Sequence, residues 1–284
     1  MITAAYQPPT KIITADGITT VLQLTDLHLF EDAQQSSQAA SCEQHFEAVL
    51  AQALAEEVRC DLILVTGDLV HEVKPSTYER IYRRLERTGI PFACIAGNHD
   101  VTDELIPATA LDSETAFEQR TLVARSLDSR LLEQHVIETT NWQLLLMDSS
   151  LPGQVAGKIS ADSLAWLQAQ LSRCSKPALL ALHHHILPMQ SAWIDAHIAK
   201  NAASLWELLA SFPQLKVIVH GHTHQQQLER YQGVTIYTTP ATSYQFLPGS
   251  DEFAFDNQAL PGYRWIQLAP DSQFNSWVVR LQQH

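Results

Sequence analysis

Short apolar segments alternate with longer amphipathic segments along most of this chain. The apolar segments predict buried strands, each ending at a polar residue or glycine; they cover residues 20–25, 62–66, 92–96, 142–147, 179–182 and 217–219. Apolar residues spaced three or four apart predict helices over residues 41–57, 77–87, 160–171 and 205–212. Ser160 is a suitable N-cap and Gly89 a suitable helix end. This alternation predicts an α/β fold with a largely parallel inner sheet and right-handed crossovers.

Two further regions have a weaker pattern. For residues 101–138 we expect helical pieces and surface loops, and after residue 225 we expect short strands over residues 235–238, 263–268 and 276–281. No internal repeat, low-complexity tract or linker interrupts the chain. We therefore predict one domain over residues 1–284, with a core at 20–226 and C-terminal strands within 227–284.

Polar residues that can bind metal ions follow most of the predicted strands. The motifs are Asp26-Leu27-His28, Gly67-Asp68, Gly97-Asn98-His99-Asp100, His183-His184-His185 and Gly221-His222-Thr223-His224. Each alone has a simpler interpretation, such as a turn-forming Asp26 or a helix-capping Asp68. Their joint occurrence at strand ends favours one shared site, because ligands of such sheets bind outside the carboxyl ends of the strands.

The residue types in these motifs suit two adjacent divalent cations. The carboxylate of Asp68 has two oxygens and can bridge two cations, and Asn98 offers a neutral carbonyl oxygen. His222 and His224 can each bind one cation if the turn between them separates their side chains. His99 is too constrained by its neighbour Asn98 to bind the same ion, and could instead face a substrate as a proton donor.

Composition narrows the possible partners and location. A net charge of −13 over 284 residues argues against general nucleic-acid binding, which needs a basic surface. Bound cations can still attract a small phosphate substrate. No apolar run is long enough to cross a bilayer and residues 1–19 contain no apolar block, so we expect a cytoplasmic protein. The scattered cysteines are expected to be reduced thiols.

The order of these motifs resembles that of the calcineurin-like metallophosphoesterase superfamily, whose pattern is D-x-H, GD, GNH[DE], a strand-end His and GHxH. All five elements are present, between residues 26 and 224. The resemblance implies a four-layer α-β-β-α sandwich with strands of mixed direction. The chain is most similar to the bacterial class III cyclic-nucleotide phosphodiesterases, through GDLVH at 67–71, HHHILP at 183–188 and PGYRW at 261–265.

The resemblance also implies roles for individual residues. It implies a first metal site of Asp26, His28 and His224, a second of Asn98, His183 and His222, and a bridging Asp68. It implies that His99 is the catalytic histidine that helps to protonate the leaving oxygen. The groups expected to contact the substrate are His28, Asn98, His99 and His224. His71 and His220 are either hydrogen-bond partners of the ligands or ordinary buried histidines.

Three consecutive histidines leave the register of the second metal site open. The family's strand-end His is normally followed by His-Pro, whereas proline comes here only at Pro188. We choose His183 as the ligand because it directly follows the apolar run, with His184 as the alternative. His185 would then lie behind the ligands or on the substrate side.

The implied chemistry is two-metal hydrolysis of a phosphodiester. Two divalent cations, two carboxylates and a bridging hydroxide leave about one positive charge, which matches a phosphodiester. The cations would lower the pKa of a bridging water, hydroxide would attack phosphorus in line with the 3′ oxygen, and His99 would protonate that oxygen. Mixed imidazole and oxygen ligands suit Fe, Mn, Zn or Co, as a divalent or mixed-valence pair.

We expect hydrolysis of 3′,5′-cyclic AMP to 5′-AMP, so that the partner is a small phosphodiester and neither nucleic acid nor a membrane. One alternative is a broader phosphodiesterase acting on glycerophosphodiesters or 2′,3′-cyclic nucleotides. Another is a non-catalytic regulator that kept the fold, which the intact ligand set argues against. The core motifs do not separate the substrates, because substrate choice lies in loops outside the metal site. The oligomeric state is left open.

Overall fold

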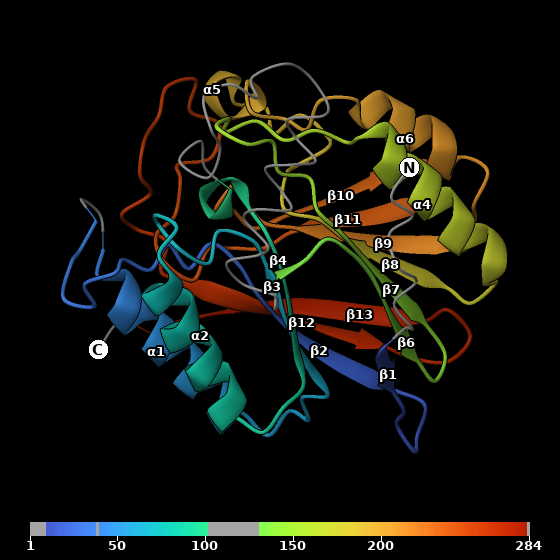
Figure 1. Ribbon diagram of the computed structural model, residues 1–284, viewed down its shortest axis with the longest axis horizontal. Helices are drawn as coiled ribbons and strands as arrows, with labels where there is room; N and C mark the ends of the chain where they lie inside the picture. The colour runs from blue at the N-terminus through green and yellow to red at the C-terminus, as the bar shows by residue number, and fades with distance from the viewer. Residues whose placement is uncertain (1–9, 38–39, 102–130, 283–284) are drawn as a thin grey trace.

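Two stacked β-sheets form the centre of the structure, a computed structural model that describes residues 10–37, 40–101 and 131–282 (Figure 1). The seven-stranded sheet contains, in spatial order, β1 (Thr10–Ile12), β6 (Gln134–Thr139), β7 (Gln143–Met147), β8 (Ala178–Ala181), β9 (Leu215–His220), β11 (Val234–Thr238) and β10 (Gln227–Tyr231). The six-stranded sheet contains β13 (Phe274–Arg280), β12 (Gly262–Leu268), β2 (Thr19–Leu24), β3 (Leu62–Thr66), β4 (Phe92–Ile95) and β5 (Leu131–Leu132).

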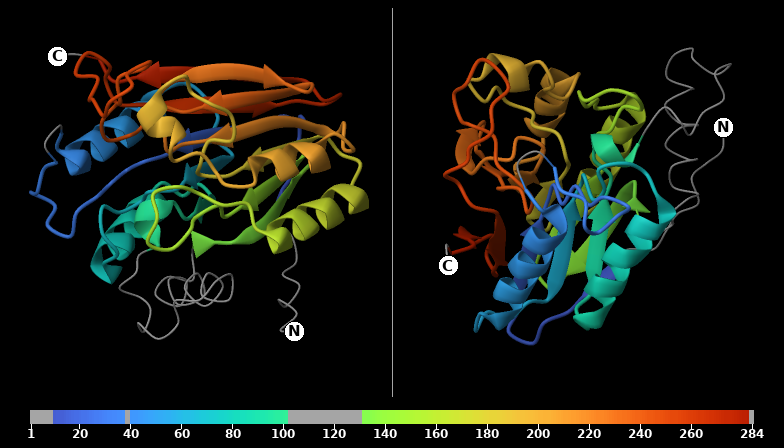
Figure 2. Two further views of the ribbon diagram at one scale, coloured as in Figure 1. Left: turned by 90° about the horizontal axis from the view of Figure 1, so that it is seen from above. Right: turned by 90° about the vertical axis from the view of Figure 1, so that its left-hand side faces the viewer.

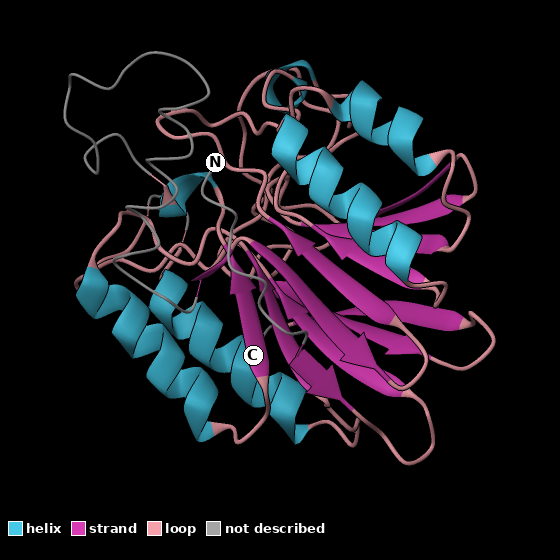
Figure 3. Cartoon of the chain, turned by 45° about the vertical axis from the view of Figure 1, so that its right-hand side comes forward, coloured by secondary structure: helices cyan, strands magenta, loops and turns pink. Residues whose placement is uncertain are grey.

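Helices cover the outer face of each sheet, as Figure 3 shows. The helices on the six-stranded sheet are α1 (Cys42–Ala55) and α2 (Pro75–Arg87), and those on the seven-stranded sheet are α4 (Ala161–Arg173) and α6 (Ala202–Leu209). The two pairs lie on opposite sides of the molecule in a second view (Figure 2). Two short elements, α5 (Ala192–Asp195) and the 3₁₀ turn η1 (Asn98–Asp100), lie in loops.

The central strands are buried on both faces because their side chains alternate between two cores. In β2, Val21 packs into the core between the sheets, whereas Leu22 and Leu24 pack against the helices. The same inter-sheet core takes Leu144 from β7 and Val217 from β9. This double burial explains why the strands appear in the sequence as continuous apolar runs instead of alternating ones.

Strand direction confirms the four-layer α-β-β-α sandwich of mixed direction. The strands β2 to β5 pair in parallel, as do β7, β8, β9 and β11. Antiparallel pairs join β12 to β2 and β13, β6 to β7, and β10 to β11. The expected largely parallel inner sheet therefore describes the middle of each sheet, and antiparallel strands extend it.

The predicted helices and strands agree with the structure to within a few residues. The hydroxyl oxygen of Ser160 accepts a hydrogen bond from the backbone N–H of Ser163 at 3.0 Å, which confirms the predicted cap. All four cysteines are free thiols. None of the described helices is long and apolar enough to cross a membrane.

Part of the expectation for residues 101–138 is corrected. Residues 131–132 and 134–139 form β5 and β6, not loops or helical pieces, and only two of the six β6 residues are buried, so their pattern has little contrast. Residues 102–130 lie outside the described residues. The edge strand β10 was also missed, because its exposed polar sequence is typical of a sheet edge and lacks a strand pattern.

Candidate metal centre

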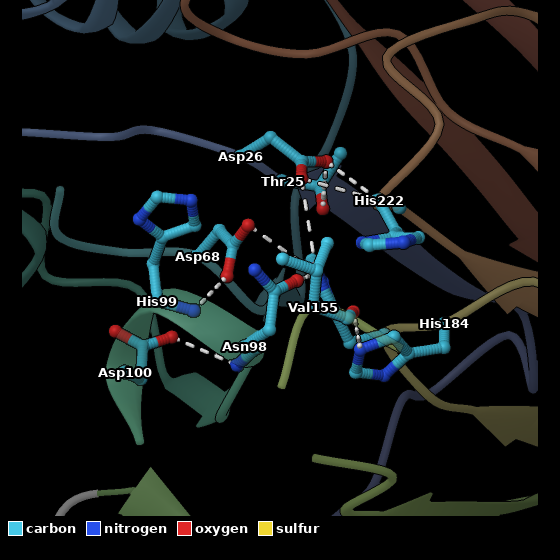
Figure 4. A network of polar contacts seen from close by, with 12 residues as sticks. Thr25, Asp26, Asp68, Asn98, His99, Asp100, Val155, His184 and His222 are labelled. Atoms are coloured by element: carbon cyan, nitrogen blue, oxygen red, sulfur yellow. Dashed lines mark hydrogen bonds and ion pairs between the residues drawn. The ribbon is translucent and has the colours of Figure 1, made fainter. Parts of the chain in front are cut away.

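Two interlocked turns of the same backbone form build one side of the site. Asp26 and His28 follow β2, His222 and His224 follow β9, and all four have a positive φ between 48° and 67°. This left-handed conformation costs about 1–2 kcal/mol in most residues, although Asp and His adopt it more readily than others. The backbone N–H of His222 donates to both carboxylate oxygens of Asp26, at 3.1 and 3.0 Å (Figure 4). The two turns are thereby locked together.

Two glycines permit this close approach. A Cβ on Gly221 would lie 1.9 Å from Thr25 Oγ1, and one on Gly67 would lie 2.3 Å from Nδ1 of His183. Both distances are far below van der Waals contact, so the ligand-bearing loops need glycine where they cross.

A first group of donors comes from the interlocked turns. Nε2 of His224 lies 3.3 Å from Oδ1 of Asp26 and 3.1 Å from Nε2 of His28. The carbonyl of Tyr244 accepts from Nδ1 of His224 at 2.7 Å, so the lone pair of His224 is on Nε2. These three buried side chains could hold a metal ion.

Asp68, at the end of β3, lies between this group and a second one. Its Oδ2 is 3.5 Å from Nε2 of His28 and 3.4 Å from Nε2 of His183, and its Oδ1 accepts from the backbone N–H of His99 at 2.8 Å. Burial alone would raise the pKa of Asp68, but the neighbouring His183 and His99 outweigh it and hold that pKa well below its usual range. The carboxylate is therefore charged and shared by both groups.

The second group contains His183, His222 and Asn98. Nδ1 of His183 donates to the carbonyl of Thr66 at 2.8 Å, and its Nε2 lies 3.3 Å from Oδ1 of Asn98. The rings of His183 and His222 are 5.1 Å apart. Nε2 of His222 is buried and has no hydrogen-bond partner among the described residues. A buried imidazole nitrogen without a partner fits a metal ligand.

His184 lies next to this second group but its ring nitrogens are engaged elsewhere. The carbonyl of Val155 accepts from its Nε2 at 3.1 Å (Figure 4). Ser149 Oγ lies 2.8 Å from its Nδ1. A carbonyl can only accept, so Nε2 carries the proton and Nδ1 accepts from the serine hydroxyl. His183, by contrast, directs its Nε2 toward Asp68 and Asn98.

His99 lies at the open side of the site. Its Nδ1 donates to the carbonyl of His71 at 2.8 Å, and its ring meets that of His28 edge-on, with 4.6 Å between centroids. The ring is partly exposed, unlike the buried ring of His28. Its Nε2, for which no hydrogen bond to the described residues is seen, can therefore meet a ligand at the centre.

Asp100 holds the His99 loop in place, a role that the sequence did not assign to it. Its Oδ2 accepts from the backbone N–H groups of Gly97 and Leu69 at 2.8 and 3.2 Å, and its Oδ1 accepts from the hydroxyl of Tyr78 at 2.8 Å. These bonds join the loops after β3 and β4. Burial raises the pKa of Asp100 to about 7.

Comparisons with known proteins agree with this geometry. Residues 19–226 match the sequence model of the family described as calcineurin-like phosphoesterase. The chain belongs to this family. It is 53% identical over 279 residues, 96% of this chain and 98% of the relative, to a protein of Psychrobacter arcticus named "Probable cyclic nucleotide phosphodiesterase". It is 33% identical over 268 residues to the 3′,5′-cyclic adenosine monophosphate phosphodiesterase CpdA of Pseudomonas aeruginosa, covering 94% of this chain and 91% of that one.

Solved structures show the same fold at low identity. A dimetal phosphatase from Danio rerio aligns with a TM-score of 0.56 at 16% identity, covering 92% of this chain and 98% of that one. The purple acid phosphatase PPD1 of yellow lupin aligns with a TM-score of 0.63 at 11% identity, covering 93% of this chain and 54% of that one. The calcineurin-like fold inferred from the five motifs is confirmed.

The divalent metal ions that this family implies fit the protonation states of the site. Burial lowers the pKa of His28 and His222 well below the usual value, so both imidazoles are neutral and can donate a lone pair. Burial also acts to lower the pKa of His183, but Asp68 raises it to about 9. Carboxylates that draw a proton onto a buried neighbour form a suitable environment for a cation.

Three further histidines, His185, His220 and His71, lie beside these side chains of the calcineurin-like site. The ring of His185 stacks on that of His222 with 5.6 Å between centroids, and burial lowers the pKa of His185 to about 3. His220 is buried, and its Nδ1 lies 3.0 Å from the carbonyl of Gly221. The side chain of His71 is exposed, its ring centroid lies 5.3 Å from that of His99, and its backbone carbonyl accepts from Nδ1 of His99.

A buried chain of hydrogen bonds leads from Arg264 on β12 to His183. Nε of Arg264 donates to the hydroxyl of Thr239 at 3.0 Å, which donates to Gln23 at 2.7 Å, and Gln23 donates to the hydroxyl of Thr66 at 2.9 Å. The carbonyl of Thr66 then accepts from His183. The sequence did not predict these contacts, because isolated polar residues within apolar strands show no pattern that identifies their partners. Only Arg264 was noted, as part of the PGYRW segment.

Proposed function

We propose that this protein is a metal-dependent phosphodiesterase that hydrolyses 3′,5′-cyclic AMP to 5′-AMP. The observation that carries the proposal is the position of Asp68, whose Oδ2 lies within 3.5 Å of an imidazole from each of two groups of donors. A shared carboxylate is the arrangement that a pair of cations needs. The cyclic nucleotide phosphodiesterases of P. arcticus and P. aeruginosa, which align over nearly the whole chain, support the substrate.

We assign two metal ions to the site. Asp26, His28 and His224 would hold the first, Asn98, His183 and His222 the second, and Asp68 both. The engaged nitrogens of His184 support His183 as the ligand. Fe, Mn, Zn and Co all suit these donors. When bound, such cations activate water and polarise the phosphoryl oxygens.

The chain's own side chains then orient the substrate and move one proton. The carbonyl of His71 fixes the proton of His99 on Nδ1, so a second proton on Nε2 is the one that can pass to the leaving 3′ oxygen. Asp100 keeps this imidazole in place through the loop that carries it. Asn98, His28 and His224 would line the same side of the substrate phosphate.

Substrate turnover by metal-defined protein tests the proposal. Chelated protein, verified as metal-free by elemental analysis, should be inactive, and Mn²⁺ or Fe²⁺ should restore turnover. Side-by-side rates on 3′,5′-cyclic AMP, 2′,3′-cyclic AMP and glycerophosphocholine should favour the first. Full activity of metal-free protein would refute the metal requirement, and a preference for either other substrate would refute the substrate assignment.

We further propose a single domain over residues 1–284 and a cytoplasmic location. The inter-sheet core supports the first, because it includes side chains from Ile12 to Leu268. The four free thiols support the second, since reduced cysteines are typical of reducing compartments.

A further inference from the structure

Four aromatic residues form one face of a hairpin beside the metal centre. Phe246 pairs with Phe255 in an antiparallel bridge, and the backbone N–H of Leu247 donates to the carbonyl of Ala254 at 2.9 Å. Side chains two residues apart along a strand share a face. The aromatic face therefore consists of Tyr244, Phe246, Phe253 and Phe255. Ring centroids along it are 5.0 to 5.8 Å apart in successive contacts.

Backbone contacts fix this hairpin against the metal centre. The carbonyl of Tyr244 accepts from Nδ1 of His224 at 2.7 Å, and the hydroxyl of Ser243 donates to the carbonyl of Asp26 at 2.7 Å. The ring of Phe246 stacks on that of His224, with 4.1 Å between centroids and 19° between planes. The aromatic face thus begins at a proposed metal ligand and extends outward to Phe253.

Phe253 ends this face with an open ring. It is 57% exposed, although it touches Phe246, Phe255 and Trp193, whose ring is 5.2 Å away. Trp193 comes from α5, which lies beside the loop between β11 and β12 (Figure 1) and is tied to it by a bond from the N–H of Ala192 to Asp251 at 3.3 Å. An aromatic ring that only filled a core would be buried. This ring is joined to His224 through Phe246, with centroid distances of 5.4 and 4.1 Å, so an open, flat apolar surface lies near the polar centre.

We propose that Phe253, supported by Trp193 and Phe246, is the surface on which the nucleobase of the substrate stacks. The inference rests on the proposed action on cyclic nucleotides. The metal centre would bind the phosphate of the substrate. The nucleobase is the flat, apolar part of the substrate and needs a separate binding surface. Stacking accepts any base, so the subsite selects nucleotides over base-free sugar phosphates more strongly than it selects adenine over guanine.

Inhibition by the product and by its base-free analogue tests this subsite. Metal-loaded wild type, Phe253→Ala, Phe253→Trp and the control Leu247→Ala would be assayed with bis(p-nitrophenyl) phosphate, and Ki would be measured for 5′-AMP and for ribose 5-phosphate. Leu247 is a suitable control because it is 42% exposed and lies one residue from Phe246, on the opposite face of the hairpin.

We expect Phe253→Ala to raise the Ki for 5′-AMP about tenfold and to change that for ribose 5-phosphate by much less. Phe253→Trp should restore tight binding of 5′-AMP, and Leu247→Ala should resemble wild type. Equal changes for both inhibitors, or no change for 5′-AMP, would overturn the subsite. This assay does not use cyclic AMP, so a failure of the subsite is distinguishable from a failure of wild type to hydrolyse cyclic AMP.

Discussion

The two edges of the sheets are formed by the ends of the same strands, but charged side chains are buried at one edge and mostly exposed at the other. At the carboxyl edge, where β2, β3, β4, β8 and β9 end, Asp26 and Asp68 are buried among imidazoles. At the amino edge, where these strands begin, Arg59 pairs with Asp16 at 2.8 Å and with Asp61 at 3.1 Å, and its side chain is 47% exposed. Buried charge is costly unless it is compensated, whereas exposed pairs contribute little.

Backbone strain differs between the edges in the same way. Asp68 and the four residues of the interlocked turns all have a positive φ, and all five are buried proposed ligands. At the amino edge the positive φ values fall on glycines such as Gly17 and on residues of tight turns, such as Gln232, Asp271 and Ser272. At the carboxyl edge the strained backbone positions the proposed ligands, whereas at the amino edge it only forms tight turns. Substitutions should have very different consequences at the two edges.

The largest loss of activity is expected at Asp68. Asp68→Asn keeps the shape of the side chain but removes the charge shared by both groups of donors, so kcat/KM for cyclic AMP should fall ~10³-fold or more. Elemental analysis should show fewer than two metal ions per chain. Asp61→Asn, at the amino edge, is the matched control and should keep two metal ions per chain. An Asp68→Asn protein with two metals and normal turnover would exclude the bridging role.

A loss of similar or smaller size is expected at His99, without loss of metal. General acid catalysis typically contributes ~10²–10⁴-fold, and His99→Ala should lose rate on that scale with cyclic AMP. The loss should shrink with bis(p-nitrophenyl) phosphate, whose phenolate leaves without a proton. Equal losses on both substrates would indicate that His99 positions the phosphate, and loss of metal would show that it is a ligand.

These expectations came largely from the sequence, because the spacing of residues just after a strand determines which side chains lie together at its end. The Asp-x-His and His-x-His spacings identified both interlocked turns, and the directly preceding apolar run favoured His183 over its neighbours. Contacts between distant segments left no such pattern. Asp100 reaching Leu69, and Gln23 linking Thr239 to Thr66, became visible only when the strands were placed side by side. The same holds for the aromatic face, since aromatic residues in a loop have no diagnostic period.

The neighbouring His183 and His184 provide a finer test within the carboxyl edge. His183→Ala removes the ring nitrogen Nε2 that faces Asp68 and Asn98, so metal affinity at the second site should fall by more than ~100-fold, beyond the range for groups that only orient a ligand. His184→Ala breaks contacts to Ser149 and Val155 instead, and should weaken metal binding about tenfold or less. Metal titration of both variants decides which histidine is the ligand. A larger loss of metal affinity in His184→Ala than in His183→Ala would move the ligand assignment to His184.

The smallest effect is expected at the amino edge, from Arg59→Ala. The side-chain hydrogen bond from Arg59 lowers the pKa of Asp16 below its ordinary value of 3.8. A carboxyl whose pKa is lowered by folding adds stability above its unfolded pKa and loses it as the pH falls through the folded value. The pair therefore contributes fully above about pH 4, and its contribution declines as the pH falls from there through the lowered pKa of Asp16. Water and salt screen both exposed partners, so Arg59→Ala should lower the melting temperature only slightly at pH 7, and less at pH 3.

The kcat/KM of Arg59→Ala should stay within about twofold of wild type. A loss of turnover on the scale expected for His99→Ala would show that the two edges are energetically coupled through the strands.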